Sequence, residues 1–133
     1  MSPLKHVMCI DDEEDILQVT RLALETVGGL QVSVCKGGAG ALAQAKQVRP
    51  DLILLDVMMP GMDGPSTFRV LKADLEVAEI PIIFMTAKVQ PSEVSNYIKL
   101  GALGVIPKPF DPMTLAKQAE SLWESFQRSK HEH

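Results

Sequence analysis

Five short apolar runs recur along the chain, and each is followed by a turn and then by a stretch with helical spacing. The runs cover residues 6–10, 30–34, 52–55, 80–85 and 102–106. The first, third and fourth runs are almost continuously apolar, which predicts strands that are covered on both faces. The second run alternates apolar and polar residues, and the fifth is the weakest of the set. These two are therefore predicted at the edges of a sheet.

The stretches between the runs predict helices. The first helix has Ile16, Val19, Ala23 and Val27 on one face and is predicted to end at the glycine pair 28–29. Proline and glycine boundaries predict further helices over 40–48, from 64, over 91–100, and from 111 to 128. Their apolar residues include Phe68, Val70, Leu71, Val94, Tyr97, Ile98, Leu115, Ala119, Leu122 and Phe126. The alternation predicts an α/β fold, a doubly wound (βα)5 domain whose parallel five-stranded sheet has helices on both faces.

Length and charge limit the kinds of protein that this chain can be. Its 133 residues suit one domain, predicted over 1–128, followed by a polar tail at 129–133 that is expected to fray. The net charge of −4 disfavours direct binding to the phosphate backbone of nucleic acids. No apolar stretch approaches the roughly 20 residues that a membrane span needs. Because Cys9 and Cys35 are isolated and no secretion signal is present, we expect a cytoplasmic protein.

Polar side chains stand at the ends of four predicted strands. Asp11 and Asp12 follow the first strand, Asp56 the third and Thr86 the fourth, and Lys108 lies in the loop after the fifth. In an open parallel sheet, ligands bind beyond the carboxyl ends of the strands. We therefore expect three carboxylates, a hydroxyl and an ammonium to converge at one edge of the sheet.

The electrostatics of such a cluster favour a bound metal ion. Two carboxylates about 4 Å apart repel by roughly 4 kcal/mol at an effective dielectric constant near 20. Lys108 alone does not offset three carboxylates, so a divalent cation is predicted. Oxygen ligands suit Mg²⁺ or Mn²⁺, and the lack of nearby Cys or His argues against zinc. Simpler interpretations remain open: an acidic cap on the first helix, a turn role for Thr86 and a surface position for Lys108.

A carboxylate beside a hard cation can attack a phosphoryl group and form an acyl phosphate. Asp56 is the candidate nucleophile. In this scheme Asp12 and Asp56 bind the metal directly, and Asp11 contributes through water. Thr86 and Lys108 would hold the phosphoryl oxygens after transfer.

Residues 5–126 resemble the receiver domain of two-component response regulators, in particular those of the chemotaxis-regulator type. The resemblance rests on residues 10–13, on the run 50–64 with the sequence PDLILLDVMMPGMDG, and on residues 85–87 and 108–110. It implies a flavodoxin-like sheet with the strand order 2-1-3-4-5, which is already known for chemotaxis regulators.

The resemblance also implies roles for individual residues. Asp56 is implied as the phosphoacceptor, Asp11 and Asp12 as the acidic metal pair, and the backbone carbonyl of Met58 as a further ligand of Mg²⁺ or Mn²⁺. The metal would serve the transfer of the phosphoryl group to Asp56.

Two more residues and the partners follow from the same resemblance. Thr86 is implied as the hydroxyl that moves towards the phosphoryl group, Lys108 as its ionic partner, and the 108–109 peptide bond as cis. Such a domain is no enzyme in the usual sense, but a phosphoacceptor that promotes its own phosphorylation and dephosphorylation. The implied partners are a sensor histidine kinase or histidine phosphotransfer protein and a downstream effector. We also expect that activation can produce a homodimer.

One position departs from the family pattern. Val105 stands where the family usually has an aromatic ring that rotates on activation. We therefore expect the signal to travel through the loop after Thr86 and the helix that contains Tyr97, towards a face formed by the fourth helix, the fifth strand and the fifth helix. Met58 and Lys88 lie two positions after Asp56 and Thr86 and resemble the family's positions that tune loss of the phosphoryl group. Because Met58 cannot orient water by hydrogen bonding, we expect slow hydrolysis.

Two other classes of protein share part of this pattern. Hydrolases of the haloacid dehalogenase type also phosphorylate an aspartate at a strand end, but they carry a second aspartate where this chain has Met58. A flavodoxin-type electron carrier would need a phosphate-binding loop after the first strand, where this chain has acidic residues. The chain is expected to be a stand-alone receiver, with the alternative that it is a receiver excised from a hybrid kinase or a transcription regulator.

Overall fold

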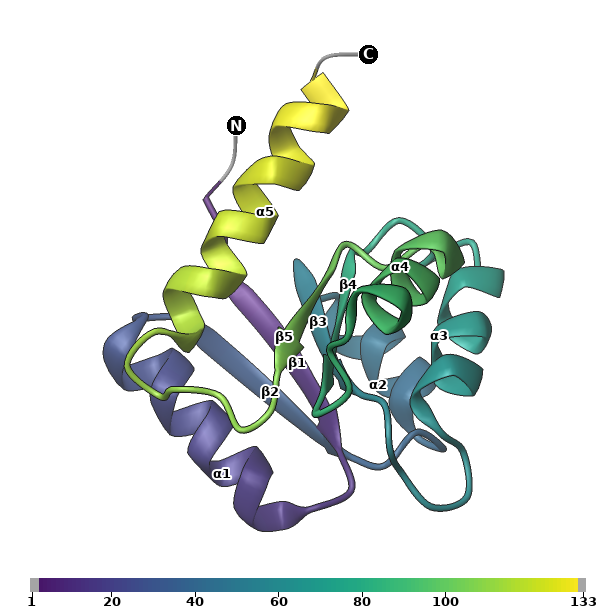
Figure 1. The fold of residues 1–133 in the computed structure, drawn as a ribbon, viewed down its shortest axis with the longest axis horizontal. Helices are drawn as coiled ribbons and strands as arrows, with labels where there is room; N and C mark the ends of the chain where they lie inside the picture. The colour runs from purple at the N-terminus through teal and green to yellow at the C-terminus, as the bar shows by residue number, and fades with distance from the viewer. Residues whose placement is uncertain (1–2, 132–133) are drawn as a thin grey trace.

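The computed structural model describes residues 3–131 and has a five-stranded parallel sheet in the order β2-β1-β3-β4-β5 (Figure 1). The strands are β1 (His6–Asp11), β2 (Gln31–Lys36), β3 (Leu52–Asp56), β4 (Ile82–Thr86) and β5 (Gly104–Pro107). The predicted strand order is confirmed, and β2 and β5 lie at the edges as their weaker patterns indicated.

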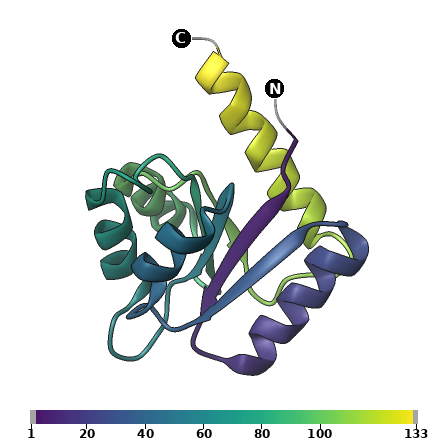
Figure 2. The ribbon, with the colours of Figure 1, turned by 180° about the vertical axis from the view of Figure 1, so that it is seen from behind.

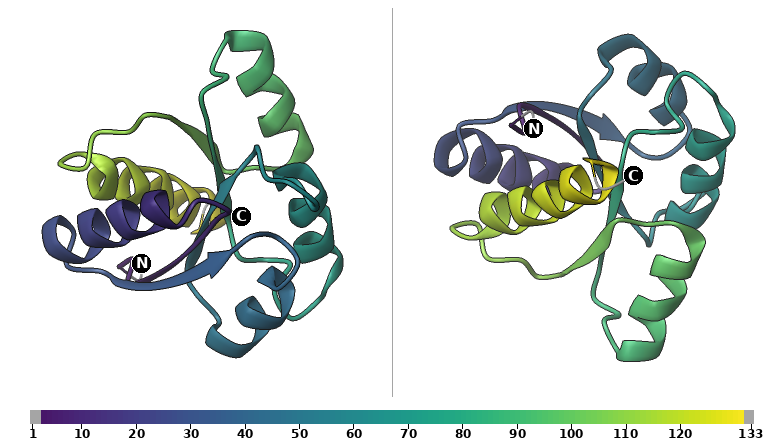
Figure 3. Two further views of the ribbon diagram at one scale, coloured as in Figure 1. Left: turned by 90° about the horizontal axis from the view of Figure 1, so that it is seen from below. Right: turned by 90° about the horizontal axis from the view of Figure 1, so that it is seen from above.

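Helices cover both faces of the sheet (Figure 3). They are α1 (Glu14–Leu22), the π-helical segment η1 (Ala23–Val27), α2 (Ala41–Val48), α3 (Gly64–Ala73), α4 (Pro91–Leu100) and α5 (Leu115–His131). One face carries α1, η1 and α5, and the other carries α2, α3 and α4. No helix among residues 3–131 is both long and apolar enough to cross a bilayer.

The sheet has a separate apolar core on each face. Because side chains alternate along a strand, neighbouring residues of one strand enter opposite cores. Cys9 and Met85 pack towards α1 and α5, whereas Ile10 and Phe84 pack towards α2, α3 and α4. This double burial explains why the central strands are almost continuously apolar.

The predicted apolar face of the first helix is only partly buried. Ala23 is buried and Ile16 is half-buried, but Val19 and Val27 are each 45% exposed. The other buried residues of this segment are Leu17, Thr20 and Leu24. The apolar residues of this segment form two neighbouring stripes, and the π-helical turn at its end shifts the later residues relative to a regular helix. Val19 lines an apolar cavity of about 420 Å³ beside the loop after β5 instead of the sheet.

The end of the chain also differs from the prediction. Residues 129–131 continue α5 instead of fraying, and residues 132–133 lie outside the described part. Phe126 packs against Trp123 with 5.8 Å between ring centroids, and the ammonium of Lys130 lies 5.9 Å from the Phe126 ring. These contacts one turn apart support the last turns of α5, which project beyond the sheet (Figure 1). Leu4 enters the same core as Trp123, and the start of β1 lies beside α5 (Figure 2).

Candidate acidic site

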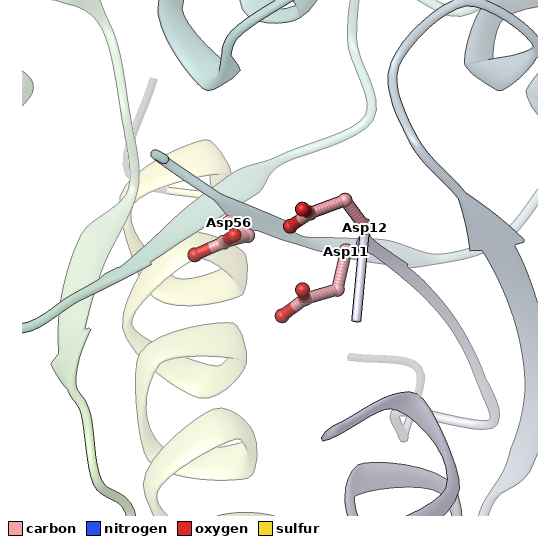
Figure 4. A group of neighbouring side chains, drawn as sticks. All are labelled: Asp11, Asp12 and Asp56. Carbon is pink, nitrogen blue, oxygen red and sulfur yellow. The ribbon is translucent and has the colours of Figure 1, made fainter. Parts of the chain in front are cut away.

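The carboxyl ends of β1, β3 and β4 bring the predicted site residues together. Asp11, Asp56 and Thr86 are the last residues of these strands, and all three are buried. One oxygen each of Asp11, Asp12 and Asp56 lies within 4.8 Å of the others, and their side chains converge (Figure 4). The predicted convergence of three carboxylates is therefore present.

Lys108 joins the cluster from the loop after β5. Its ammonium donates to Asp11 Oδ2 and to Asp56 Oδ1, at 2.9 Å in each case. The backbone N–H of Lys108 also donates to the carbonyl oxygen of Thr86 at 2.9 Å, which ties this loop to the end of β4. The Lys108–Pro109 peptide bond is cis, as the resemblance implied. The interpretation of Lys108 as a mere surface ammonium is wrong.

Burial and neighbouring charges shift the pKa values of Asp56 and Lys108. Burial raises the pKa of Asp56, and the charges of Asp11 and Asp12 raise it further, whereas the hydrogen bond from Lys108 acts in the opposite direction. Burial lowers the pKa of Lys108, but its hydrogen bonds to Asp11 and Asp56 outweigh that effect and leave the pKa above its usual value. The ammonium therefore stays charged at neutral pH, and one cation faces three carboxylates.

The oxygen atoms of the site fit a hard divalent cation. Asp12 Oδ1 is buried and has no hydrogen-bond partner among the described residues. A buried carboxylate oxygen without a partner is costly unless something positive satisfies it. Asp11 Oδ1 accepts the backbone N–H of Glu13 at 3.0 Å, so this residue supports the start of α1 as well as facing the cluster. Carboxylate oxygens at this spacing suit Mg²⁺ or Mn²⁺, with Asp11, Asp12 and Asp56 as the residues that would hold the ion.

Thr86 stabilises the turn after β4 and also lies beside the acidic cluster. Its Oγ1 accepts the backbone N–H of Lys88 at 3.0 Å, which holds the first residues after β4 in a turn. The side chain is buried at the end of a strand that pairs with β3, next to the strand end that carries Asp56. Met58 lies in the loop after β3 and is 66% exposed, and the role of its carbonyl oxygen stays a prediction.

Gly64 is a contributor to the site that the sequence interpretation placed only at a helix start. A Cβ at this position would lie 2.5 Å from the carbonyl oxygen of Asp56 and 2.7 Å from Cα of Val57. The N–H of Gly64 donates to the carbonyl oxygen of Val57 at 3.0 Å. The first turn of α3 therefore packs directly on the backbone of Asp56, which only glycine permits. The glycine that ends the run 50–64 was the available signal.

The comparisons with known proteins agree with this geometry. Residues 7–120 match the family model described as "Response regulator receiver domain". The DNA-binding response regulator MtrA of Mycobacterium tuberculosis is 33% identical over 117 residues, which is 88% of this chain and 50% of that protein. The transcriptional regulatory protein CseB of Streptomyces coelicolor is 32% identical over 126 residues, which is 95% of this chain and 52% of that protein. The chain thus spans about half the length of these curated relatives.

Solved structures give the same result. The chemotaxis protein CheY4 of Vibrio cholerae superposes with a TM-score of 0.82 at 30% identity, covering 90% of this chain and 98% of that one. The signal receiver domain of a histidine kinase from Syntrophus aciditrophicus superposes with a TM-score of 0.78 at 30% identity, covering 93% of each chain. With its sheet order, its acidic cluster and its matched residues, the chain belongs to the family of response regulator receiver domains.

Proposed function

We propose that this receiver domain is a phosphorylation-dependent switch in which Asp56 accepts a phosphoryl group from a sensor histidine kinase or a histidine phosphotransfer protein. The observation that carries the proposal is the position of Asp56 itself. Asp56 is the last residue of the central strand β3. One of its carboxylate oxygens lies within 4.8 Å of oxygens of Asp11 and Asp12, and its Oδ1 accepts a hydrogen bond from the Lys108 ammonium at 2.9 Å. This set of groups matches the needs of phosphoryl transfer to a carboxylate.

In the transfer, an Asp56 carboxylate oxygen forms a bond to phosphorus while the bond from phosphorus to the donor's histidine nitrogen breaks. The product is an acyl phosphate on Asp56. Asp11, Asp12 and Asp56 would hold a Mg²⁺ or Mn²⁺ ion, which would supply positive charge to neutralise the phosphoryl oxygens. Lys108, already at the Asp56 carboxylate, supports the new group through charge-assisted hydrogen bonds. The Thr86 hydroxyl supplies a further hydrogen bond after its side chain turns towards Asp56.

The switch follows from the contacts that the phosphoryl group adds. Moving a population from 1:99 to 99:1 requires about 5.5 kcal/mol of preference for the active arrangement. A few charge-assisted hydrogen bonds and a metal ion are enough to supply this preference. We place the output on the face formed by α4, β5 and α5, where an effector or a second copy of the chain would dock. Ile98 of α4 is exposed there, and Val105 of β5 is partly exposed.

The wider role of the chain is also part of the proposal. MtrA is named as a DNA-binding protein, and the chain matches half of it. For this domain we propose an effector protein as the direct partner instead of DNA, because the net charge of the chain is −4. A place in a longer regulator or hybrid kinase is the alternative to a stand-alone receiver. The cytoplasmic location, the limits 1–128 of the domain and the slow hydrolysis stay predictions.

Incubation with acetyl phosphate and Mg²⁺ tests the proposal. We expect intact-protein mass spectrometry to detect a gain of about 80 Da, the mass of one phosphoryl group on a carboxylate nucleophile. The Asp56→Ala variant should lack this gain. Asp15→Ala removes an exposed carboxylate of α1 and should behave as the wild type. Equal labelling of the wild type and Asp56→Ala would refute Asp56 as the acceptor.

A further inference from the structure

Three aromatic rings form a row beneath the end of β4. Phe68 of α3 lies 5.4 Å from Phe84 of β4, and Phe84 lies 5.0 Å from Tyr97 of α4, measured between ring centroids. Phe84 precedes Thr86 by two residues on the same strand, so both side chains point to the same face of the sheet. On the neighbouring strand the partner of Phe84 is Val105, which has no ring. Tyr97 therefore supplies the ring that covers Phe84 from the side of α4.

The end of this row at α3 is fixed. Phe84 is fully buried, and Phe68 is nearly so. The ammonium of Lys72, 5.6 Å from the Phe68 ring, donates to the carbonyl oxygens of Ala78 and Ile80 at 3.0 and 2.8 Å. Phe68 and Phe84 thus form a rigid platform inside the core. Tyr97 is the partly exposed ring of the three.

The helix that carries Tyr97 is attached mainly at one end. None of the ten residues of α4 is fully buried. At its C-terminal end, the N–H of Ala102 donates to the carbonyl oxygen of Tyr97 at 3.1 Å. A Cβ on Gly101 would lie 3.3 Å from the Phe68 ring, so the chain passes close over the platform at this point. The C-terminal end of α4 is therefore the natural pivot.

The N-terminal end of α4 is held far less firmly. Residues 87–90, which lead from β4 to α4, are all exposed, as are Pro91 and Ser92. Within this connection the N–H of Lys88 donates to Thr86 Oγ1 at 3.0 Å. Figure 3 places α4 at the outer end of its helix layer. Thr86, at the end of the strand that pairs with β3, is thus hydrogen-bonded to the connection that leads into α4.

We propose that Tyr97 is the positioning residue through which Thr86 sets the orientation of α4. When the Thr86 side chain turns towards a phosphoryl group on Asp56, the Lys88 N–H loses its acceptor and the connection to α4 rearranges. The helix then pivots about Gly101, and the Tyr97 ring slides over the fixed Phe84 ring. The inference rests on the proposed phosphorylation of Asp56, and it assigns to α4 the ring movement that Val105 cannot make.

The chain offers two selective probes for this movement, because it contains one tyrosine and one tryptophan. Tyr97 labelled as 3-fluorotyrosine gives a single protein ¹⁹F resonance, and Mg²⁺ with beryllofluoride serves as the mimic of the phosphoryl group. We expect the Tyr97 resonance to shift by more than its line width. Trp123, labelled as 5-fluorotryptophan, packs in the opposite core and is the matched control that should not shift. A shift at Trp123 with a stationary Tyr97 would overturn the inference.

Variants of Thr86 test whether the movement passes through its hydroxyl. Thr86→Ser keeps the hydroxyl and should keep the Tyr97 shift, whereas Thr86→Ala should lose it. The bound beryllofluoride gives its own ¹⁹F signal, which shows in the same spectrum that Asp56 is occupied. A Tyr97 shift that persists in Thr86→Ala at full occupancy would contradict the proposed link.

Coupling between two sites is reciprocal, so Tyr97 must also affect binding at Asp56. Tyr97→Leu weakens the ring contact that holds α4 in the arrangement seen here. Beryllofluoride should therefore bind Tyr97→Leu more tightly, by roughly two- to tenfold, the range that aromatic pair energies imply. Tyr97→Phe keeps the ring and should bind as the wild type does. Unchanged or weaker binding in Tyr97→Leu would overturn the inference.

The two proposals fail in different ways. If beryllofluoride gives no bound signal that Asp56→Ala removes, the proposed phosphorylation of Asp56 is refuted, and the role of Tyr97 fails with it. If the bound signal is present and Tyr97 stays in place, the phosphorylation stands and the role of Tyr97 is refuted.

Discussion

The Lys108 ammonium lies 2.9 Å from the Asp56 carboxylate, although 52 residues separate the two in the chain. It lies equally close to Asp11, so this one cation joins the ends of β1 and β3. Only 18% of the Lys108 side chain is exposed. An ion pair with so little access to water has consequences for stability as well as for chemistry.

Replacing Lys108 should destabilise the domain when no divalent cation is present. Lys108→Met leaves Asp11 and Asp56 buried without their cation, and breaking such a pair costs about 3 kcal/mol. Urea unfolding in EDTA measures this loss, and Mg²⁺ should reduce it because the ion takes over the neutralisation. Lys36→Met, which removes an exposed ion pair with Glu14, is the control and should change stability by less than about 0.5 kcal/mol. Equal losses in the two variants would contradict the structural role of Lys108.

Mg²⁺ should stabilise the fold through the unpartnered oxygen of Asp12. A ligand that binds only the folded state adds about 2.7 kcal/mol at a concentration of 100 Kd. The Asp12→Asn variant keeps the size of the side chain but loses its charge, so the stabilisation by Mg²⁺ should fall well below that of the wild type. Asp15→Asn, on the exposed first turn of α1, should respond to Mg²⁺ like the wild type. Thermal unfolding with Mg²⁺ and after its removal by EDTA distinguishes these results.

Much of the fold and of the site could be predicted because both depend on local signals. Continuous apolar runs mark central strands, and strand ends of a parallel sheet meet at one edge, so Asp11, Asp56 and Thr86 could be grouped without coordinates. The bounds of α4 were predicted correctly from Pro91 and from the glycine after Leu100. These features need only periodicity and strand direction.

Two kinds of feature could not be predicted from the sequence: how deeply a residue is buried, and which distant segments are in contact. Periodicity placed Val19 and Val27 on one helix face, but it could not show that the neighbouring stripe with Leu17 faces the sheet. It likewise gave no sign that α4 buries none of its residues fully. The packing of Gly64 against the backbone of Asp56 arises only when α3 folds back on β3.

The exposed Met58 predicts a long-lived phosphoryl group. Its thioether side chain offers no good hydrogen bond to the water that must attack the acyl phosphate. Met58→Asn supplies such a hydrogen bond and should speed hydrolysis on the order of tenfold, below the range of full general-base catalysis. Met113→Asn, at another exposed methionine, should leave the rate unchanged. Mass spectrometry after removal of acetyl phosphate gives the rates, and a half-life of seconds in the wild type at neutral pH would count against the prediction.

The raised pKa of Asp56 predicts a pH dependence of stability with a definite sign. Burial and the charges of Asp11 and Asp12 lift the folded-state pKa above the unfolded value of 3.8. The folded state therefore binds the proton of the Asp56 carboxyl group more tightly than the unfolded state does. The stabilisation that this proton provides is fully present below pH 3.8 and is lost as the pH rises through the folded-state pKa. Without divalent cations, the wild type should become progressively less stable relative to Asp56→Asn over that range.

Asp63 is the control with the opposite sign, because its hydrogen bond from the Ser66 N–H lowers its pKa. As the pH rises, the wild type should become more stable relative to Asp63→Asn. If the stability differences for Asp56→Asn and Asp63→Asn changed in the same direction with pH, the raised pKa of Asp56 would be contradicted.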